Sequence, residues 1–177
     1  MKSSPHVPAV RSPFRLSLRI RHPSIDPSEL SREFALEPLY SFRAGDARTA
    51  VGLSGGSTRH AGSYWLADLE SAMPASLLSP PGAGGALEAQ WPPALHAARQ
   101  RAEQLLRRNV GMALAAVSLR LLQPRASLLK RISAEDGEVT LLAEISRAVA
   151  ESFTIAPQVM RPLAEWGVTV SFEFSDG

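Results

Sequence analysis

Apolar and polar residues alternate along several stretches of the chain, and this pattern predicts strands. Residues 14–21 read Phe-Arg-Leu-Ser-Leu-Arg-Ile-Arg, and residues 168–174 repeat the alternation near the end of the sequence. A period of two is typical of a strand that buries one face. Residues 39–42, 63–69 and 138–145 are expected as three further strands. In 63–69 the alternation places Tyr64, Leu66 and Asp68 on one face and Trp65, Ala67 and Leu69 on the other.

Helical start signals lie between these strands. Residues 26–29 read Asp-Pro-Ser-Glu, in which the aspartate can cap a helix and the proline suits its first turn. Leu30 and Phe34 then form the apolar stripe of this helix. Pro157 opens a similar helix over 155–165.

A longer helical pattern occupies the middle of the chain. It begins at Pro93, is interrupted near Asn109 and ends at Gly137, a natural stop residue. Residues 112–122 contain an alternating Val-Ser-Leu-Arg-Leu run that would also suit a strand. The surrounding Ala and Leu residues favour a buried helix.

Two strand–helix–strand units echo each other. Residues 25–30 (Ile-Asp-Pro-Ser-Glu-Leu) and 155–160 (Ile-Ala-Pro-Gln-Val-Met) each follow a strand, open a helix and lead into another strand. The repeat predicts an α+β fold with a duplicated, ferredoxin-like sheet and helices on one face. The alternative is that any helix after a strand favours proline in its first turn.

The length of 177 residues suits a single domain. Residues 1–13 are rich in Pro and Ser and are expected to be a flexible leader, and residues 14–177 form the domain. Residues 79–85 (Ser-Pro-Pro-Gly-Ala-Gly-Gly) are flexible by composition and mark an inserted or elongated helical segment at about 71–111.

Composition removes several function classes. The chain contains no cysteine, which excludes disulfides, thiol nucleophiles and thiolate metal sites. Its four histidines lack metal-ligand spacing, and no motif indicates a cofactor. There is no apolar stretch long enough to span a membrane and no signal peptide, so a cytoplasmic location is expected.

Charge is unevenly distributed, although the net charge is only +2. Residues 96–131 carry eight Arg or Lys against one Glu, whereas residues 132–177 carry two Arg against eight acidic residues. A functional interpretation makes the basic segment a nucleic-acid surface. The simpler interpretation, which we favour because interleaved aromatics are missing, is a pair of solvated or mutually packed faces with opposite charge.

One stretch formally matches a catalytic motif. Residues 52–56 read Gly-Leu-Ser-Gly-Gly, the G-x-S-x-G pattern of a nucleophile elbow, and His60 and Asp46 or Asp68 lie nearby in the sequence. That chemistry needs the serine on a turn between a strand and a helix. Here Ser54 precedes more loop and then a strand, so no catalytic residue is assigned.

The best candidate binding site surrounds the third strand. Arg43, Arg48, Arg59 and His60 precede Trp65 in the sequence. Arginine guanidinium groups, which can donate paired hydrogen bonds, and an exposed indole suit anionic ligands or acidic protein surfaces. The alternative is that Trp65 belongs to the core and the arginines decorate a loop.

The order of these features resembles a bacterial family, the domain of unknown function 4279. The resemblance rests on five short segments, residues 22–30, 36–38, 45–46, 63–65 and 153–167, and covers roughly 14–70 and 112–175. It implies a compact α+β fold. The family has no assigned activity, so the resemblance implies no catalytic or binding residues, and 71–111 departs from its pattern.

The leading hypothesis is a non-enzymatic binding module for a partner protein, for example an immunity-type protein, or for a small anionic ligand. One alternative is a small serine hydrolase that uses Ser54 and His60. Another alternative is nucleic-acid binding through 96–131. Strands with alternating apolar faces near both ends also make a homodimer plausible.

Overall fold

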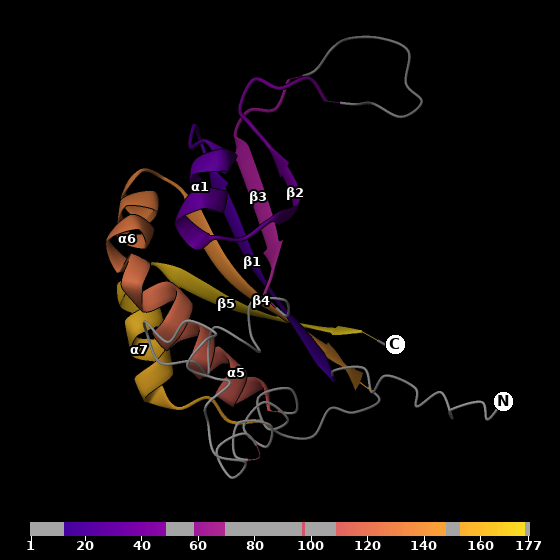
Figure 1. Ribbon diagram of the computed structural model, residues 1–177, viewed down its shortest axis with the longest axis vertical. Helices are drawn as coiled ribbons and strands as arrows, with labels where there is room; N and C mark the ends of the chain where they lie inside the picture. The colour runs from indigo at the N-terminus through magenta and orange to yellow at the C-terminus, as the bar shows by residue number, and fades with distance from the viewer. Residues whose placement is uncertain (1–12, 49–58, 70–96, 98–108, 148–152, 176–177) are drawn as a thin grey trace, which may run out of the picture.

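The computed structural model describes residues 13–48, 59–69, 97, 109–147 and 153–175 (Figure 1). Five strands in this part of the chain form one sheet in the order β2-β3-β1-β4-β5. Neighbouring strands are antiparallel except β4 and β5, which are parallel. The strands are β1 (Phe14–His22), β2 (Pro38–Phe42), β3 (Ser63–Asp68), β4 (Glu138–Ser146) and β5 (Val168–Ser175). The sheet is therefore mixed, and the predicted α+β class is confirmed.

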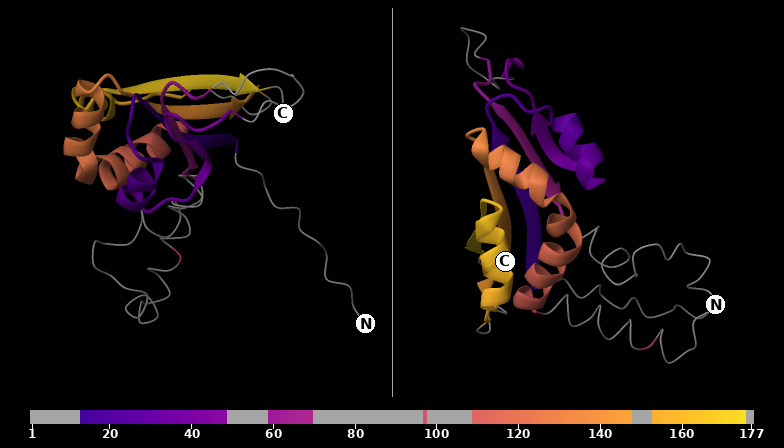
Figure 2. Two further views of the ribbon diagram at one scale, coloured as in Figure 1. Left: turned by 90° about the horizontal axis from the view of Figure 1, so that it is seen from above. Right: turned by 90° about the vertical axis from the view of Figure 1, so that its left-hand side faces the viewer.

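The described helices all lie over one side of the sheet, and none of them covers its other face (Figure 2). They are α1 (Pro27–Phe34), α5 (Val110–Val117), a π turn η1 (Ser118–Leu122), a 3-10 turn η2 (Gln123–Arg125), α6 (Ala126–Ala134) and α7 (Pro157–Glu165). The segment 112–122 is helical, as the Ala and Leu residues predicted. No described helix is long and apolar enough to cross a membrane.

Helix α1 begins where the sequence predicts. The Asp26 carboxylate accepts a hydrogen bond from the backbone N–H of Ser28 at 2.9 Å, which satisfies one of the free donors of the first turn. Pro27 occupies the first helical position, where its missing N–H costs nothing. The helix ends at Ala35 in the left-handed conformation, with φ of 53°.

The path from α5 to α6 is one helical segment with an irregular middle. Asn109 caps α5 by accepting a hydrogen bond from the Met112 N–H at 3.0 Å. The π turn Ser118–Leu122 lies directly before Pro124. In a regular α-helix the proline ring would clash with the carbonyl four residues earlier. The wider turn removes this clash and keeps the chain helical.

The core lies between the sheet and the helices. Phe14, Leu16, Leu18 and Ile20 of β1 are all buried, as their alternation predicts. The register continues this layer into the neighbouring strands, because Ile20 lies opposite Trp65 on one side and opposite Val139 on the other. Burial of each large apolar side chain contributes roughly 1.5–3 kcal/mol.

The two strand–helix–strand units occupy the sheet differently. In the first unit β1 and β2 are separated by β3, whereas in the second unit β4 and β5 are directly paired. The predicted duplication is therefore not confirmed. The predicted leader at 1–13 and the inserted segment at 71–111 lie almost wholly outside the described residues.

Candidate functional site

The turn between β2 and β3 is held together by backbone hydrogen bonds. Gly45 N–H donates to the carbonyl of His60 at 2.9 Å, and His60 N–H donates to the carbonyl of Asp46 at 3.0 Å. Gly45 has φ of 86°, a conformation that glycine adopts without strain. Residues 43–47 therefore lie next to His60, although the intervening 49–58 are outside the described part of the chain.

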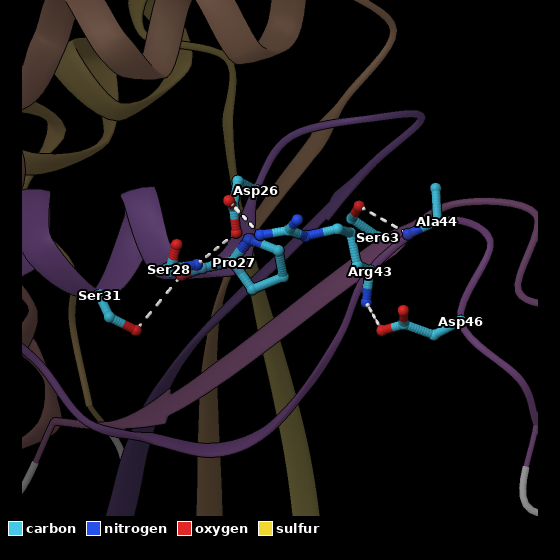
Figure 3. Close-up of polar contacts among 8 residues, drawn as sticks. All are labelled: Asp26, Pro27, Ser28, Ser31, Arg43, Ala44, Asp46 and Ser63. Atoms are coloured by element: carbon cyan, nitrogen blue, oxygen red, sulfur yellow. Dashed lines mark hydrogen bonds and ion pairs between the residues drawn. The ribbon is translucent and has the colours of Figure 1, made fainter.

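Arg43 stabilises this turn from two directions (Figure 3). Its guanidinium forms an ion pair with the Asp26 carboxylate, which ties the end of β2 to the start of α1. Its backbone N–H donates to Asp46 at 2.7 Å. Hydrogen bonds from the Ser28 backbone and from Arg43 lower the pKa of Asp26 to about 2. Arg43 is thus already paired within the protein.

The other predicted arginines of this loop are less constrained. Arg59 donates from Nη1 to the carbonyl of Gly45 at 2.7 Å, and its side chain is otherwise exposed. Arg48 is exposed at the last described position of the loop. The isolated backbone bridge between Ala47 and Arg59 brings these two stretches of the loop together.

The prediction that Trp65 presents an exposed indole is wrong. Its side chain has no exposed surface and packs on the Phe34 ring of α1, with ring centroids 5.6 Å apart. The indole Nε1 donates to the Ser31 hydroxyl at 3.0 Å. Trp65 points into the core because Ser63, Trp65 and Ala67 share the helix-covered face of β3. The buried indole is therefore not available to a ligand.

The neighbouring residue, Tyr64, instead faces the side of the sheet that no described helix covers. There it joins Tyr40 and Phe42 of β2 and His60 to form a cluster that we call the aromatic patch. The Phe42 ring lies 3.6 Å from the His60 ring and 5.4 Å from the Tyr64 ring, both in stacked orientation. The Tyr40 ring lies 5.8 Å from that of Phe42 and 5.9 Å from that of Tyr64.

The aromatic patch is partly exposed and adjoins an arginine. Tyr40 is 57% exposed, and the neighbouring Leu39 is 61% exposed. The guanidinium of Arg21 lies over the Tyr64 ring at 6.0 Å, near the outer limit of a cation–π contact. Arg21 also lies 3.8 Å from Glu138, with both side chains more than half exposed. The strand register places Phe42, Tyr64 and Arg21 in one row across the sheet.

Sequence reasoning missed Tyr40, Phe42, Tyr64 and Arg21. The alternate buried positions of β1 show which face of this strand lies toward the helices, and this could have been used to find the residues on the other face. Once β1 pairs with β3, Ile20 lies opposite Trp65 and Arg21 lies opposite Tyr64. The pairing register is a long-range feature that periodicity within 63–69 does not contain.

His22 was also missed, and it has a structural role. Its ring is buried at the end of β1, where Nδ1 accepts hydrogen bonds from the backbone N–H groups of Ser24 at 3.1 Å and Ile25 at 2.9 Å. The opposite nitrogen, Nε2, lies 3.3 Å from the Glu135 carboxylate. These contacts place the ring proton on Nε2 and fix the turn that leads into α1.

The other functions considered from the sequence, a serine hydrolase and a metal site, gain no support from the described residues. Ser54 lies outside them, so its hydrolase hypothesis is not tested. The His60 ring stacks on Phe42, and Asp46 accepts the Arg43 N–H. Within the described part of the chain, no group of three or more His, Asp or Glu side chains could hold a metal ion.

The basic segment 96–131 is only partly described, and two of its described arginines make internal contacts. Arg125 donates to the Glu33 carbonyl at 2.5 Å and to the Leu121 carbonyl at 2.8 Å. Arg131 pairs with Glu29 at 2.7 Å. These contacts join η2 and α6 to α1, which lies outside the acidic segment 132–177.

Comparisons with protein-family models, curated proteins and solved structures find no match to this chain.

Proposed function

We propose that the protein is a non-enzymatic binding module that recognises an acidic partner protein through the aromatic patch and Arg21. The observation that carries the proposal is the exposed aromatic cluster on a sheet face with no described helix over it. Exposed apolar groups gathered in this way are typical of interaction surfaces. An immunity-type protein is one kind of module that would use such a surface.

The residue types support a protein partner. Tyrosine and arginine are enriched among the residues that dominate binding energy at protein interfaces, because each combines a large contact area with polar groups. The patch supplies two tyrosines, Tyr40 and Tyr64, with Arg21 beside them. A small ligand is normally held in a concave pocket, whereas these side chains lie on an open sheet face.

Charge supports an acidic partner. Arg21 and Glu138 form a loose, exposed pair, and such pairs contribute little to stability. Arg21 can therefore exchange Glu138 for a partner carboxylate at little cost. Arg59, which is exposed and directly precedes His60 in the chain, adds positive charge beside the patch. Complementary charge of this kind favours fast and selective association.

Two structural expectations belong to the same proposal. The connectivity of β1, α1, β2, β3, α5–α6 and β4, with spatial order β4-β1-β3-β2, supports a ferredoxin-like relationship for the first four strands. We also propose that the chain is a divergent relative of the domain of unknown function 4279.

The test compares two arginines of β1 on the same face. Arg21 adjoins the aromatic patch, whereas Arg15 pairs in register with Glu144 at the far end of the strand. Binding of a glutamate-rich peptide with one central aromatic residue is measured by calorimetry for Arg21→Gln and Arg15→Gln. We expect Arg21→Gln to weaken binding by about tenfold or more and Arg15→Gln to change it little.

The same titration distinguishes the alternatives. Inorganic phosphate tests the small-anion class, and a single-stranded oligonucleotide tests nucleic-acid binding, which would show a steep salt dependence. Equal losses in both arginine variants would contradict the proposed surface. Preference for the oligonucleotide over the acidic peptide would contradict the proposed partner class.

A further inference from the structure

The two edges of the sheet differ in their protection against pairing with another strand. Edge strand β2 has five residues, starts with Pro38 and shifts register between Pro38 and Tyr40. Prolines, bulges and short length are common devices that prevent edge-to-edge pairing. Edge strand β5 has eight residues, pairs with β4 without a register shift, and contains neither Pro nor Lys.

The apolar residues of β5 become more exposed toward its C-terminal end. Val168 is buried, Val170 and Phe172 are half-buried, and Phe174 is 49% exposed. In Figure 1, β5 extends well past α7 and toward the end of the chain. The helix-covered face of the outer part of β5 therefore lacks cover from the described helices.

We propose that β5 pairs antiparallel with β5 of a second copy of this chain, so that one sheet continues through both copies. A two-fold axis at Ser171 would make this residue face its own counterpart. Side chains directly opposite each other in a sheet share a face, so residues of the same parity must pair. On the helix-covered face, Val168 then lies opposite Phe174, and Val170 lies opposite Phe172.

This register also avoids placing like charges opposite each other. On the face without helices it places Thr169 opposite Glu173. A register centred on Glu173 would bring two carboxylates together, and like charges directly opposite are destabilising. A register centred on Thr169 would leave the exposed Phe174 unpaired. The alternation of β5 thus fits a second copy of itself over nearly its whole length.

The proposed dimer does not depend on the proposed function. The aromatic patch lies on β2 and β3, at the opposite edge of the sheet from β5. Loss of dimerisation and loss of partner binding are therefore separable by mutation.

The absence of cysteine allows a direct test of the two-fold axis. Ser171→Cys places two thiols opposite each other at a separation suited to a disulfide, since opposed antiparallel residues have Cα atoms about 4.5–5.5 Å apart. Ser175→Cys, on the same strand and face but away from the axis, is the control. We expect Ser171→Cys to form a covalent dimer under mild oxidation much faster than Ser175→Cys.

Charge substitutions test the same register without cross-linking. Thr169→Glu would oppose Glu173 twice per dimer and weaken association by about tenfold in sedimentation equilibrium. The double variant Thr169→Glu/Glu173→Lys should restore association, and circular dichroism should confirm that all variants fold. A wild-type chain that stays monomeric to millimolar concentration, equal cross-linking at 171 and 175, or failure of the double variant to restore association would overturn the proposal.

Discussion

Tyr64 and Trp65 are consecutive aromatic residues of β3 with opposite roles. Trp65 has no exposed surface, packs on Phe34 and donates a hydrogen bond to Ser31. Tyr64 belongs to an exposed cluster on the other face and lies beneath Arg21. Side-chain type therefore says little about role here. The face on which a strand places each residue decides it.

The arginines near these aromatics show the same contrast. Arg43 is fixed by its ion pair with Asp26, and Arg43 N–H bonds to Asp46, so this residue stabilises the fold. Arg21 has a loose 3.8 Å contact with an exposed glutamate and lies over the Tyr64 ring, and its side chain is 56% exposed. One side of β3 is thus committed to stability, and we assign binding to the other.

The largest loss of stability is expected from a substitution on the helix-covered face of β3. Trp65→Ala should lower the free energy of unfolding by about 3–5 kcal/mol, because it removes a fully buried ring and leaves a cavity. Tyr64→Ala is the matched control and should cost about 1 kcal/mol, since its ring is only half-buried. Urea unfolding measures both values. Similar losses in the two variants would contradict the assigned faces.

A smaller effect should follow from removing the indole's hydrogen-bond partner. Ser31→Ala leaves the buried Trp65 N–H without its acceptor and should cost about 1–2 kcal/mol. Trp65→Phe combined with Ser31→Ala removes both groups. The cost of Ser31→Ala should shrink in the Trp65→Phe background, and an unchanged cost would show that the hydrogen bond contributes little.

Asp26 should make stability depend on pH. Its pKa is lowered from 3.8 to about 2 in the folded protein, so the carboxylate stabilises the fold above pH 3.8, and this contribution is lost as the pH falls through about 2. Asp26→Asn keeps a capping side chain but removes the charge. The stability difference between wild type and Asp26→Asn should therefore be full near neutral pH and shrink between about pH 4 and pH 2.

The pairing with Arg43 can be isolated by a double-mutant cycle. Arg43→Gln and Asp26→Asn should be non-additive at neutral pH, because each removes the same ion pair. Thermal unfolding across pH supplies the measurement. Additive effects, or a difference that grows at low pH, would be inconsistent with this contact.

The smallest effect on stability is expected for Tyr40→Ala. Tyr40 lies on an edge strand and is mostly exposed, so the loss should be about 0.5–1 kcal/mol from its aromatic contacts. Partner binding should fall much more, because Tyr40 is the most exposed ring of the patch. Chemical unfolding and calorimetric binding on the same preparations separate the two effects.

The sequence predicts most elements but not their assembly. Alternation located β1 and its buried set, and the Asp26-Pro27 signal located the start of α1. Strand order, and with it the separation of β1 from β2, depends on contacts between distant segments that local patterns do not encode. The aromatic patch was missed for the same reason. Both alternating sets of residues in β3 are partly apolar, and only the pairing of β3 with β1 shows which set is buried.

The central claim is that the exposed aromatic patch, and not the far end of the same sheet face, contacts a partner. Photo-crosslinking in cells that naturally make the protein tests it directly, with benzoylphenylalanine at position 40 or, as a control, at position 144, both exposed. The proposal predicts a discrete cross-linked protein from position 40 that disappears with Arg21→Gln, and none from position 144. Cross-links from position 144 alone, or from neither position, would contradict it.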